Sequence, residues 1–505
     1  MAGQEAMQEV QLDEEPGPGG VADAPGADDA AVDARRRARR RALRRWWPVP
    51  VVAVAAVVAV QVVQDARDRD RVAAAREVDG VVRYDVGPEL PVSPVDAAVA
   101  GPFATGGVVV GGLRVAGEAI EFGRPRAVQA LDAATGAEAW RTEVETQEQA
   151  TAQPTMRGPE CWGTGGAGGP DGETAPVRCL VVDRPATLTG DGGWEEAPPT
   201  RSRLLTLDAA TGAVLADREV APQAAAAADD ATLVLAEVVA DGTVRVTAED
   251  GATEQRLWST DLTDVPVDPV FDPSVMLVAD HVLVRAGDGE HVLSLQNGAW
   301  QAVGTQVWVG RAGGLLVQED DPGAVRLAGR DGAGTAVVPA LPVQLGVDDG
   351  SAPGVEILSA VVAGDRTLRA VDAVTGRTQW QAGLDGQADG APLLLGGVLY
   401  GVDATAAWAV DARDGRQLWR TPREVGVDGE PVRDTSGSWL LPATDGRALL
   451  LVESDGASPG RIVAWSLRTG AELWRAPLPP EAGGWARAWD GALYGGLEEL
   501  VRIGG

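Results

Sequence analysis

The chain has 505 residues, of which 74 are acidic and 43 are basic, so its formal net charge is −31. Nucleic-acid binding needs a basic surface, and this charge therefore excludes nucleic acid as the main partner. Two Cys and two His are too few for Cys-rich zinc sites or iron–sulfur clusters. The sequence also lacks a phosphate-binding loop, a nucleophile elbow and a dinucleotide fingerprint.

The N-terminal region changes from an acidic to a basic and then to an apolar composition. Residues 1–34 are rich in Ala, Gly and Pro and carry nine acidic side chains, so we expect a disordered acidic tail. Residues 35–45 contain eight Arg, and residues 46–63 form an uncharged apolar run that starts at Trp46 and Trp47. Eighteen helical residues span about 27 Å, which is close to the hydrocarbon thickness of a bilayer. We therefore predict a single transmembrane helix at 46–63.

The flanking charges predict the orientation of this helix. An Arg-rich flank stays in the cytoplasm, so the N-terminus is expected inside the cell and the rest of the chain outside. The leader before the apolar run is long for a signal peptide, which favours an uncleaved signal anchor over the alternative of a cleaved one. Residues 64–80 are expected to form a short helical stalk, and residues 81–505 form the functional domain.

The functional domain contains an internal repeat. An alternating apolar strand is followed by Asp-x-x-Thr-Gly and then by a short strand that ends in Trp. Alternation places one face of a strand against a neighbouring sheet. Five strong copies occupy residues 127–141, 204–218, 368–381, 407–420 and 463–475.

Each position of the repeat has a physical reason. The Asp accepts backbone N–H bonds inside the turn, the Gly supplies the positive φ that closes the hairpin, and the Trp fills the gap between packed sheets. The Trp lies four residues after the Gly and is expected to be structural. The residues are Asp132, Gly136 and Trp140; Asp208 and Gly212; Asp372, Gly376 and Trp380; Asp411, Gly415 and Trp419; Gly470 and Trp474.

Weaker copies surround Gly251, Gly298 and Gly332. The spacing between successive copies leaves room for four short strands per repeat, which is typical of a β-propeller. Counting every weak copy and a closing blade gives nine blades. Because these copies are degenerate, we predict eight blades, with seven as the alternative. The C-terminal segment stops before an outer strand, and residues 81–86 are expected to supply it, with Tyr84 in the Trp place.

The motif at Ala130, Asp132, Thr135, Gly136, Glu138 and Trp140 resembles the tryptophan-docking repeat of pyrroloquinoline quinone (PQQ) enzymes. The resemblance implies the quinoprotein alcohol dehydrogenase-like propeller, a fold that many members use without a cofactor, among them the lipoprotein that scaffolds outer-membrane protein assembly. Catalytic members have two adjacent Cys and a Glu/Asn/Asp calcium set. Here Cys161 and Cys179 are separated in sequence, and Asn297 lies in an expected turn. We therefore expect no cofactor, with PQQ and Ca²⁺ as the alternative.

The insertion between the first two copies carries the remaining candidates. Outside the membrane, Cys161 and Cys179 are expected to form a disulfide, with a redox pair as the alternative. Trp162 and Trp194 are candidate partner contacts, and the alternative is a stapled loop without a binding role. The acidic turn at 191–196 lacks the spaced ligands of a calcium site.

The two His residues, His281 and His291, flank a turn. No third metal ligand is evident near them, so packing at a strand edge is predicted rather than metal binding.

These expectations define a single-pass membrane protein that displays a non-catalytic extracytoplasmic propeller for an envelope protein partner. A PQQ-dependent dehydrogenase and a sensor coupled to the acidic tail are the alternatives.

Overall fold

The computed structural model describes part of the chain, and all structural statements below concern that part. The described residues are 48–95, 107–118, 124–133, 135, 137–145, 158–163, 176–189, 193–229, 231–239, 242–263, 265, 272–319, 321–330, 332–334, 336–362, 365–384, 390–403, 405–423, 442–453, 460–496 and 499–505. The acidic tail, the Arg cluster, Trp46, Trp47 and Gly136 lie outside them. The chain divides into two compact units, Met1–Arg71 and Val72–Gly505, which are described separately.

The first unit contains most of helix α2 (Pro48–Arg76). Pro48 and Pro50 lie in the first turn of the helix, where proline is tolerated because its fixed φ suits that turn, and no Pro or Gly follows up to Arg76. The helix includes most of the expected span 46–63 and continues through most of the expected stalk. Within residues 48–505, as far as they are described, no helix is long and apolar enough to cross a membrane.

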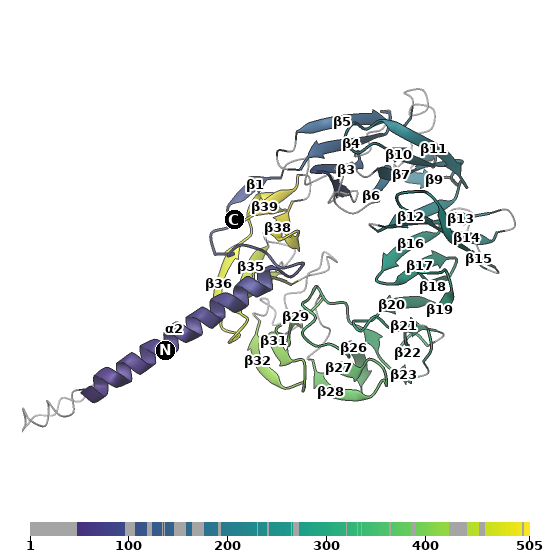
Figure 1. Ribbon diagram of the computed structural model, residues 1–505. Helices are drawn as coiled ribbons and strands as arrows, with labels where there is room; N and C mark the ends of the chain where they lie inside the picture. The colour runs from purple at the N-terminus through teal and green to yellow at the C-terminus, as the bar shows by residue number, and fades with distance from the viewer. Residues whose placement is uncertain are drawn as a thin grey trace, which may run out of the picture. The chain divides into compact units, whose positions relative to one another are not determined.

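The second unit is a β-propeller, as the repeat predicts. Figure 1 shows its sheets arranged around a common centre. Blades 1 to 3 consist of β2 (Val108–Val110), β3 (Leu113–Gly117), β4 (Ala127–Asp132) and β5 (Glu138–Glu143); β6 (Glu160–Gly163), β7 (Val177–Asp183), β10 (Arg201–Leu207) and β11 (Val214–Val220); and β12 (Ala224–Ala228), β13 (Thr232–Val238), β14 (Val244–Asp250) and β15 (Arg256–Leu262).

Blades 4 to 6 consist of β16 (Ser274–Val278), β17 (His281–Ala286), β18 (Gly289–Ser294) and β19 (Trp300–Gly304); β20 (Gln306–Val309), β21 (Leu315–Gln318), β22 (Val325–Ala328) and β23 (Ala336–Val338); and β24 (Leu341–Pro342), β26 (Val355–Val362), β27 (Asp365–Asp372) and β28 (Thr378–Gly383).

Blades 7 to 9 consist of β29 (Leu393–Leu395), β30 (Val398–Val402), β31 (Ala406–Asp411) and β32 (Gln417–Pro422); β33 (Ala443–Thr444), β34 (Ala448–Glu453), β35 (Arg461–Ser466) and β36 (Glu472–Pro477); and β37 (Arg487–Trp489), β38 (Ala492–Gly495), β39 (Val501–Ile503) and β1 (Val92–Pro94). A 3₁₀ turn, η1 (Pro480–Ala482), connects blades 8 and 9.

The prediction of eight blades is wrong, because the described residues form nine. The weak copies around Gly251, Gly298 and Gly332 each belong to a complete four-stranded sheet, namely blades 3, 4 and 5. Alternating apolar residues suffice to build these strands, so the loss of a Trp from the motif does not remove a blade. The seven-bladed alternative fails for the same reason.

The ring closes with strands from both ends of the chain, but not with the expected residues. The outermost strand of blade 9 is β1, in which Val92 pairs with Ile503 of β39. Residues 81–86 do not form a strand and contact blades 8 and 9 through individual hydrogen bonds. In blade 8, the Val82 N–H donates to the Thr444 carbonyl at 2.8 Å. The Tyr84 hydroxyl donates to the Ile503 carbonyl at 2.6 Å. The pattern at 81–86 therefore reflects burial and not sheet pairing.

The apolar core lies between neighbouring blades. Eight buried clusters each combine side chains of two consecutive blades, and together they cover every junction from blades 1 and 2 to blades 8 and 9. Each blade is therefore apolar on both faces, which explains the continuous buried runs in middle strands such as β7 and β34.

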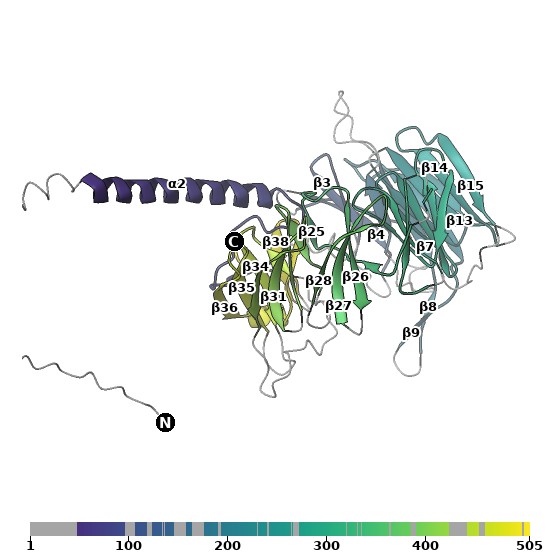
Figure 2. The ribbon, with the colours of Figure 1, turned by 90° about the horizontal axis from the view of Figure 1, so that it is seen from below.

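Two strand pairings fall outside the four-stranded pattern. β25 (Val347–Asp348) comes from the connection within blade 6 and adds in parallel to β29, the first strand of blade 7. β8 (Ala186–Leu188) and β9 (Trp194–Glu196) form a separate hairpin between β7 and β10 of blade 2. Figure 2 shows this hairpin extending beyond the strands of the blades.

Candidate functional site

The Asp-x-x-Thr turns are built by the Asp side chains. Asp132 Oδ1 accepts hydrogen bonds from the backbone N–H and the hydroxyl of Thr135, both at 2.8 Å. Asp208 and Asp372 make the same two bonds to the Thr three residues later. Donation from the Thr375 hydroxyl and N–H lowers the pKa of the Asp372 carboxyl. These carboxylates are therefore engaged in turn formation.

The Trp residues join each blade to the next one. The Trp140 indole N–H donates to the Ala209 carbonyl of blade 2 at 2.9 Å, and its ring covers Gly212, where an added Cβ would lie 2.4 Å from the ring. Trp380 and Trp419 make equivalent bonds, to Ala412 and Leu467 of blades 7 and 8. We call such a contact a docking seam.

The docking seams explain why glycine is required at the turns. Gly212, Gly415 and Gly470 have φ of 72°, 74° and 70°, and an indole ring of the preceding blade lies against each of them. A Cβ would be strained by the positive φ and would also collide with the ring. Trp474 of blade 8 is half-buried against the cluster shared with blade 9.

Trp258 also docks, although in the sequence it ends a weak copy and lies seven residues after Gly251 instead of four. Its indole N–H donates to the Leu295 carbonyl at 2.8 Å, and its ring covers Gly298. In its own turn the residue with positive φ is Glu254, at 59°, and not Gly251. Asp250 bonds Thr253 as in the strong copies, so the motif is Asp250-x-x-Thr253-Glu254. The four-residue spacing from position 254 to Trp258 is the signal that would have identified it.

Glu is tolerated at position 254 because no indole ring covers that turn. The docking position of blade 2, four residues after Gly212, is Ala216. Charged groups occupy the space: Glu254 lies 3.4 Å from the guanidinium of Arg178, and Arg178 donates to the Gly251 carbonyl at 3.0 Å. Arg178 is almost fully buried and the Glu254 side chain is half-exposed, so a partly exposed ion pair holds this seam in place of a Trp.

The seam between blades 4 and 5 is also polar. The docking position holds Ala302, and the neighbouring Gln301 donates from Nε2 to the Arg330 carbonyl of blade 5 at 2.7 Å. Gln301 Oε1 lies 2.7 Å from Nδ1 of His281, whose Nε2 lies 3.2 Å from the Gly313 carbonyl. His281 is thus buried between two acceptor oxygens at a blade junction and contacts them through both ring nitrogens.

His291 lies on the neighbouring strand β18 and has a different environment. It packs edge-to-face on Trp300, with ring centroids 5.3 Å apart, and burial lowers the pKa of its imidazole. Across the part of the chain that the structure describes, no group of three or more His, Cys, Asp or Glu is placed to hold a metal ion.

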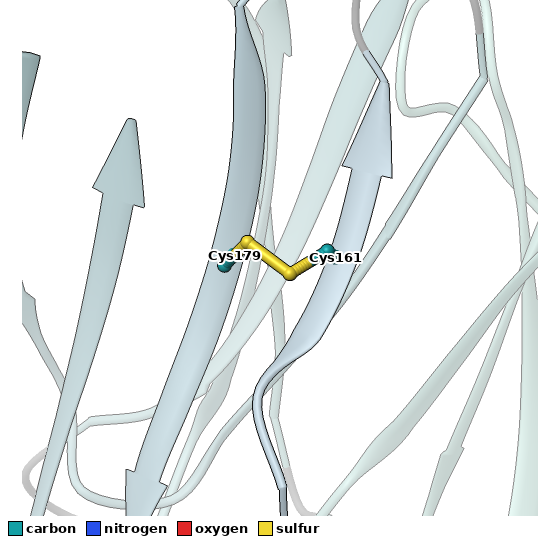
Figure 3. Close-up of a disulfide and its surroundings, with 2 residues drawn as sticks. All are labelled: Cys161 and Cys179. Carbon is teal, nitrogen blue, oxygen red and sulfur yellow. A yellow bond between two sulfur atoms is a disulfide. The ribbon is translucent and has the colours of Figure 1, made fainter. Parts of the chain in front are cut away.

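The expected disulfide is confirmed. Cys161 of β6 and Cys179 of β7 face each other in the strand register, with Cα atoms 4.1 Å apart (Figure 3). Both are buried in the cluster shared by blades 1 and 2. The bond therefore joins two strands inside a blade, and it is not a staple within a surface loop.

The two candidate partner contacts have different surroundings. Trp162 is half-buried against the cluster between blades 2 and 3. Trp194 begins β9, and its side chain lies outside the described residues. The base of the hairpin is fixed by Arg184, whose guanidinium lies 2.6 Å from the buried Asp272 carboxylate. Asp191 and Gly192 of the acidic turn lie outside the described residues.

Buried ion pairs also connect blades. Arg126 of blade 1 contacts Glu145 at 2.8 Å and Asp183 of blade 2. Arg423 of blade 7 contacts Glu453 of blade 8 at 3.2 Å, and both side chains are almost completely buried. Breaking such a pair leaves an uncompensated buried charge, so these residues have a structural role.

These features define an all-β, nine-bladed propeller whose blades are joined by tryptophan docking and by buried ion pairs. Residues 342–490 match the family described as outer membrane protein assembly factor BamB. The resemblance to the PQQ-like repeat propellers is therefore confirmed, and this segment carries repeats of that family. No curated protein matches the chain.

Solved structures with similarity include BamB from Moraxella catarrhalis, at 18% identity over 84% of this chain and 99% of that one, with a TM-score of 0.34. A quinohemoprotein alcohol dehydrogenase from Comamonas testosteroni is 14% identical over 85% of this chain and 77% of that one, with a TM-score of 0.33. The quinohemoprotein alcohol dehydrogenase ADHIIG from Pseudomonas putida HK5 is 14% identical over 86% and 81%, with the same TM-score.

Proposed function

We propose that the chain is a non-catalytic binding or scaffold module of the cell envelope, displayed outside the cytoplasmic membrane. The observation that carries this proposal is the structural use of the repeat residues. The Asp carboxylates bond their own turns, and the Trp rings cover the glycines of the next blade. The repeat thus supports a rigid ring on which insertions and strand edges are presented. The match to the BamB family agrees with a scaffold role.

The disulfide and the N-terminal sequence support the proposed compartment. Disulfides persist in oxidising compartments, and both sulfurs belong to the packed interior of blade 2. The eight Arg before residues 46–63 support a cytoplasmic N-terminus and a membrane anchor at this run. A phosphatase reporter fused at residue 30 should be inactive, and one fused after residue 505 should be active; the opposite pattern would overturn this orientation.

The residues that a quinoprotein would use have other tasks in this chain. Asn297 Oδ1 accepts the Ala299 N–H at 2.9 Å within the turn before β19. The cysteines are cross-strand partners inside a blade. Both arrangements favour the binding module over the dehydrogenase.

The test of the proposal uses the purified protein with added PQQ and Ca²⁺. Absorbance after gel filtration and a dye-linked alcohol oxidation assay should show no retained cofactor and no turnover. Retained cofactor together with turnover would replace this proposal with the dehydrogenase.

A further inference from the structure

The outer strands of the blades differ in how their edges are protected. The outermost strand of a blade exposes a row of backbone N–H and C=O groups that can pair with another strand. Native sheets block such edges with charged residues or Pro. In β5, β11, β15, β32 and β36 the strand itself contains Arg, Asp or Glu, and β1 ends at Pro94.

Blades 4, 5 and 6 lack this protection. β19, β23 and β28 contain no charged residue and no Pro. In β28, however, the exposed positions are Thr, Gln and Gly, and Trp380 is buried between blades, so only β19 and β23 combine an uncharged strand with exposed apolar side chains. The absence of charge extends beyond the strands: residues 292–310 and 332–347 contain no Asp, Glu, Arg or Lys, although 23% of the chain is charged. Gln301 of β19 donates to the Arg330 carbonyl in the turn before β23, so the two uncharged strands belong to neighbouring blades that meet at a charged turn.

The same two strands expose apolar side chains. Trp300 and Val303 of β19 are 49% and 44% exposed, and Val337 of β23 is 65% exposed. We call these two strands with their exposed side chains the uncharged edge. Other outer strands also expose a Leu, such as Leu257 of β15 and Leu473 of β36, but there a charged residue stands on the same strand.

We propose that the uncharged edge binds an extended, uncharged apolar segment of another protein, which adds to blade 4 as a further antiparallel strand. This inference rests on the proposed binding function and names its partner class. Backbone groups along the edge specify a β-strand as the occupant, and the exposed Trp300 and Val303 specify apolar side chains on it. A lipid surface does not fit, because lipid cannot satisfy unpaired backbone N–H and C=O groups.

The net charge of the chain restricts which charge the bound segment can carry. With 74 acidic and 43 basic residues, the protein repels an acidic segment and also a second copy of itself. The occupant is therefore a neutral strand flanked by neutral or basic residues.

The probe is a short fluorescent peptide of alternating threonine and valine with a lysine at each end, added to the full chain in detergent. Fluorescence anisotropy should show saturable binding, and amide hydrogen exchange should slow in residues 300–304. Val303→Lys should weaken binding by about tenfold or more, because it places a charge on the edge. Leu473→Lys on the already charged β36 is the matched control and should leave binding unchanged.

Two further measurements keep the inference open to refutation. The same peptide with alternate N-methylated residues keeps its side chains but loses N–H donors, and it should not bind. Vesicles of phosphatidylcholine and phosphatidylglycerol should not slow exchange at residues 300–304. No peptide binding, equal loss with Leu473→Lys, or protection by vesicles would overturn the inference. The cofactor test of the proposed function is unaffected by these outcomes.

Discussion

The docking seam between blades 6 and 7 allows a quantitative test of tryptophan docking. Gly415 has φ of 74°, and a Cβ there would lie 2.8 Å from three atoms of Trp380. Gly415→Ala places an L-residue in the left-handed region, which costs about 1–2 kcal/mol. It also displaces the indole ring and weakens its hydrogen bond to the Ala412 carbonyl, which contributes about 0.5–1.5 kcal/mol. The expected loss in the free energy of unfolding is therefore about 1.5–3.5 kcal/mol.

The matched control is Gly354→Ala. Gly354 has φ of 73°, but no atom lies within 4 Å of the position of its Cβ. This substitution carries the backbone strain without the collision, so its cost should stay at about 1–2 kcal/mol. The difference between the two variants isolates docking. Urea unfolding monitored by circular dichroism gives both values from the shift in midpoint.

A double-mutant cycle completes this test. In a Trp380→Ala background the ring is absent but the Cβ of residue 380 remains, so Gly415→Ala should cost less there than in the unmodified chain. Trp380→Ala alone should cost about 3–5 kcal/mol, because the ring is buried between blades 6 and 7. Equal losses for Gly415→Ala and Gly354→Ala in the unmodified chain would refute the reasoning that the ring dictates glycine at the turn.

Three further predictions concern the disulfide, a buried His and ring closure. Replacing Cys161 and Cys179 together by Ala should lower the free energy of unfolding by about 3 kcal/mol, and reductant should then no longer shift the urea midpoint of the variant. Burial lowers the pKa of His291, so the folded state binds its proton less tightly than the unfolded state does. The contribution of this residue to stability is complete above the ordinary imidazole pKa of about 6.5 and is lost as the pH falls below it. His291→Phe should reduce the drop in urea midpoint between neutral and mildly acidic pH, and an unchanged drop would contradict this. Ser93 of β1 faces Arg502 of β39 in the strand register. The double variant Ser93→Cys and Arg502→Cys should therefore form a disulfide between these strands and raise the urea midpoint of unfolding. Free thiols at both positions in mass spectrometry would show that this register is wrong.

Sequence patterns predicted the architecture where the chemistry of the motif is local. Turn formation by Asp132 and Thr135 depends on residues three apart, and a spacing of this kind is visible in the sequence. The number of blades was predicted wrongly because three copies of the motif are degenerate; blade 3, for example, has a non-glycine residue at its positive-φ position. Counted from Gly251, the spacing to Trp258 does not match the motif. Counted from Glu254, the residue with positive φ, it is the four residues of the strong copies.

The closing strand shows a second limit. Both 81–86 and 92–94 precede the first blade, and only the more apolar segment, 81–86, was predicted as the outer strand. In the structure Val81 and Val82 are buried against blades 7 to 9, while the short β1 pairs with β39. An outermost strand has only one hydrogen-bonded neighbour and is partly exposed, so strong apolar character is a poor marker for it.

Docking residues on consecutive blades depend on each other, and this dependence explains why a turn that receives a Trp has glycine. Where blade 1, 3, 6 or 7 presents a Trp, the next turn has Gly212, Gly298, Gly415 or Gly470, because the ring leaves no room for a Cβ. Where blade 2 presents Ala216, the next turn carries Glu254, whose carboxylate reaches Arg178. Placing Trp at 216 without Gly at 254 would therefore force a collision. The two positions lie 38 residues apart in the numbering but form one packing unit, so each repeat has to be interpreted together with its successor.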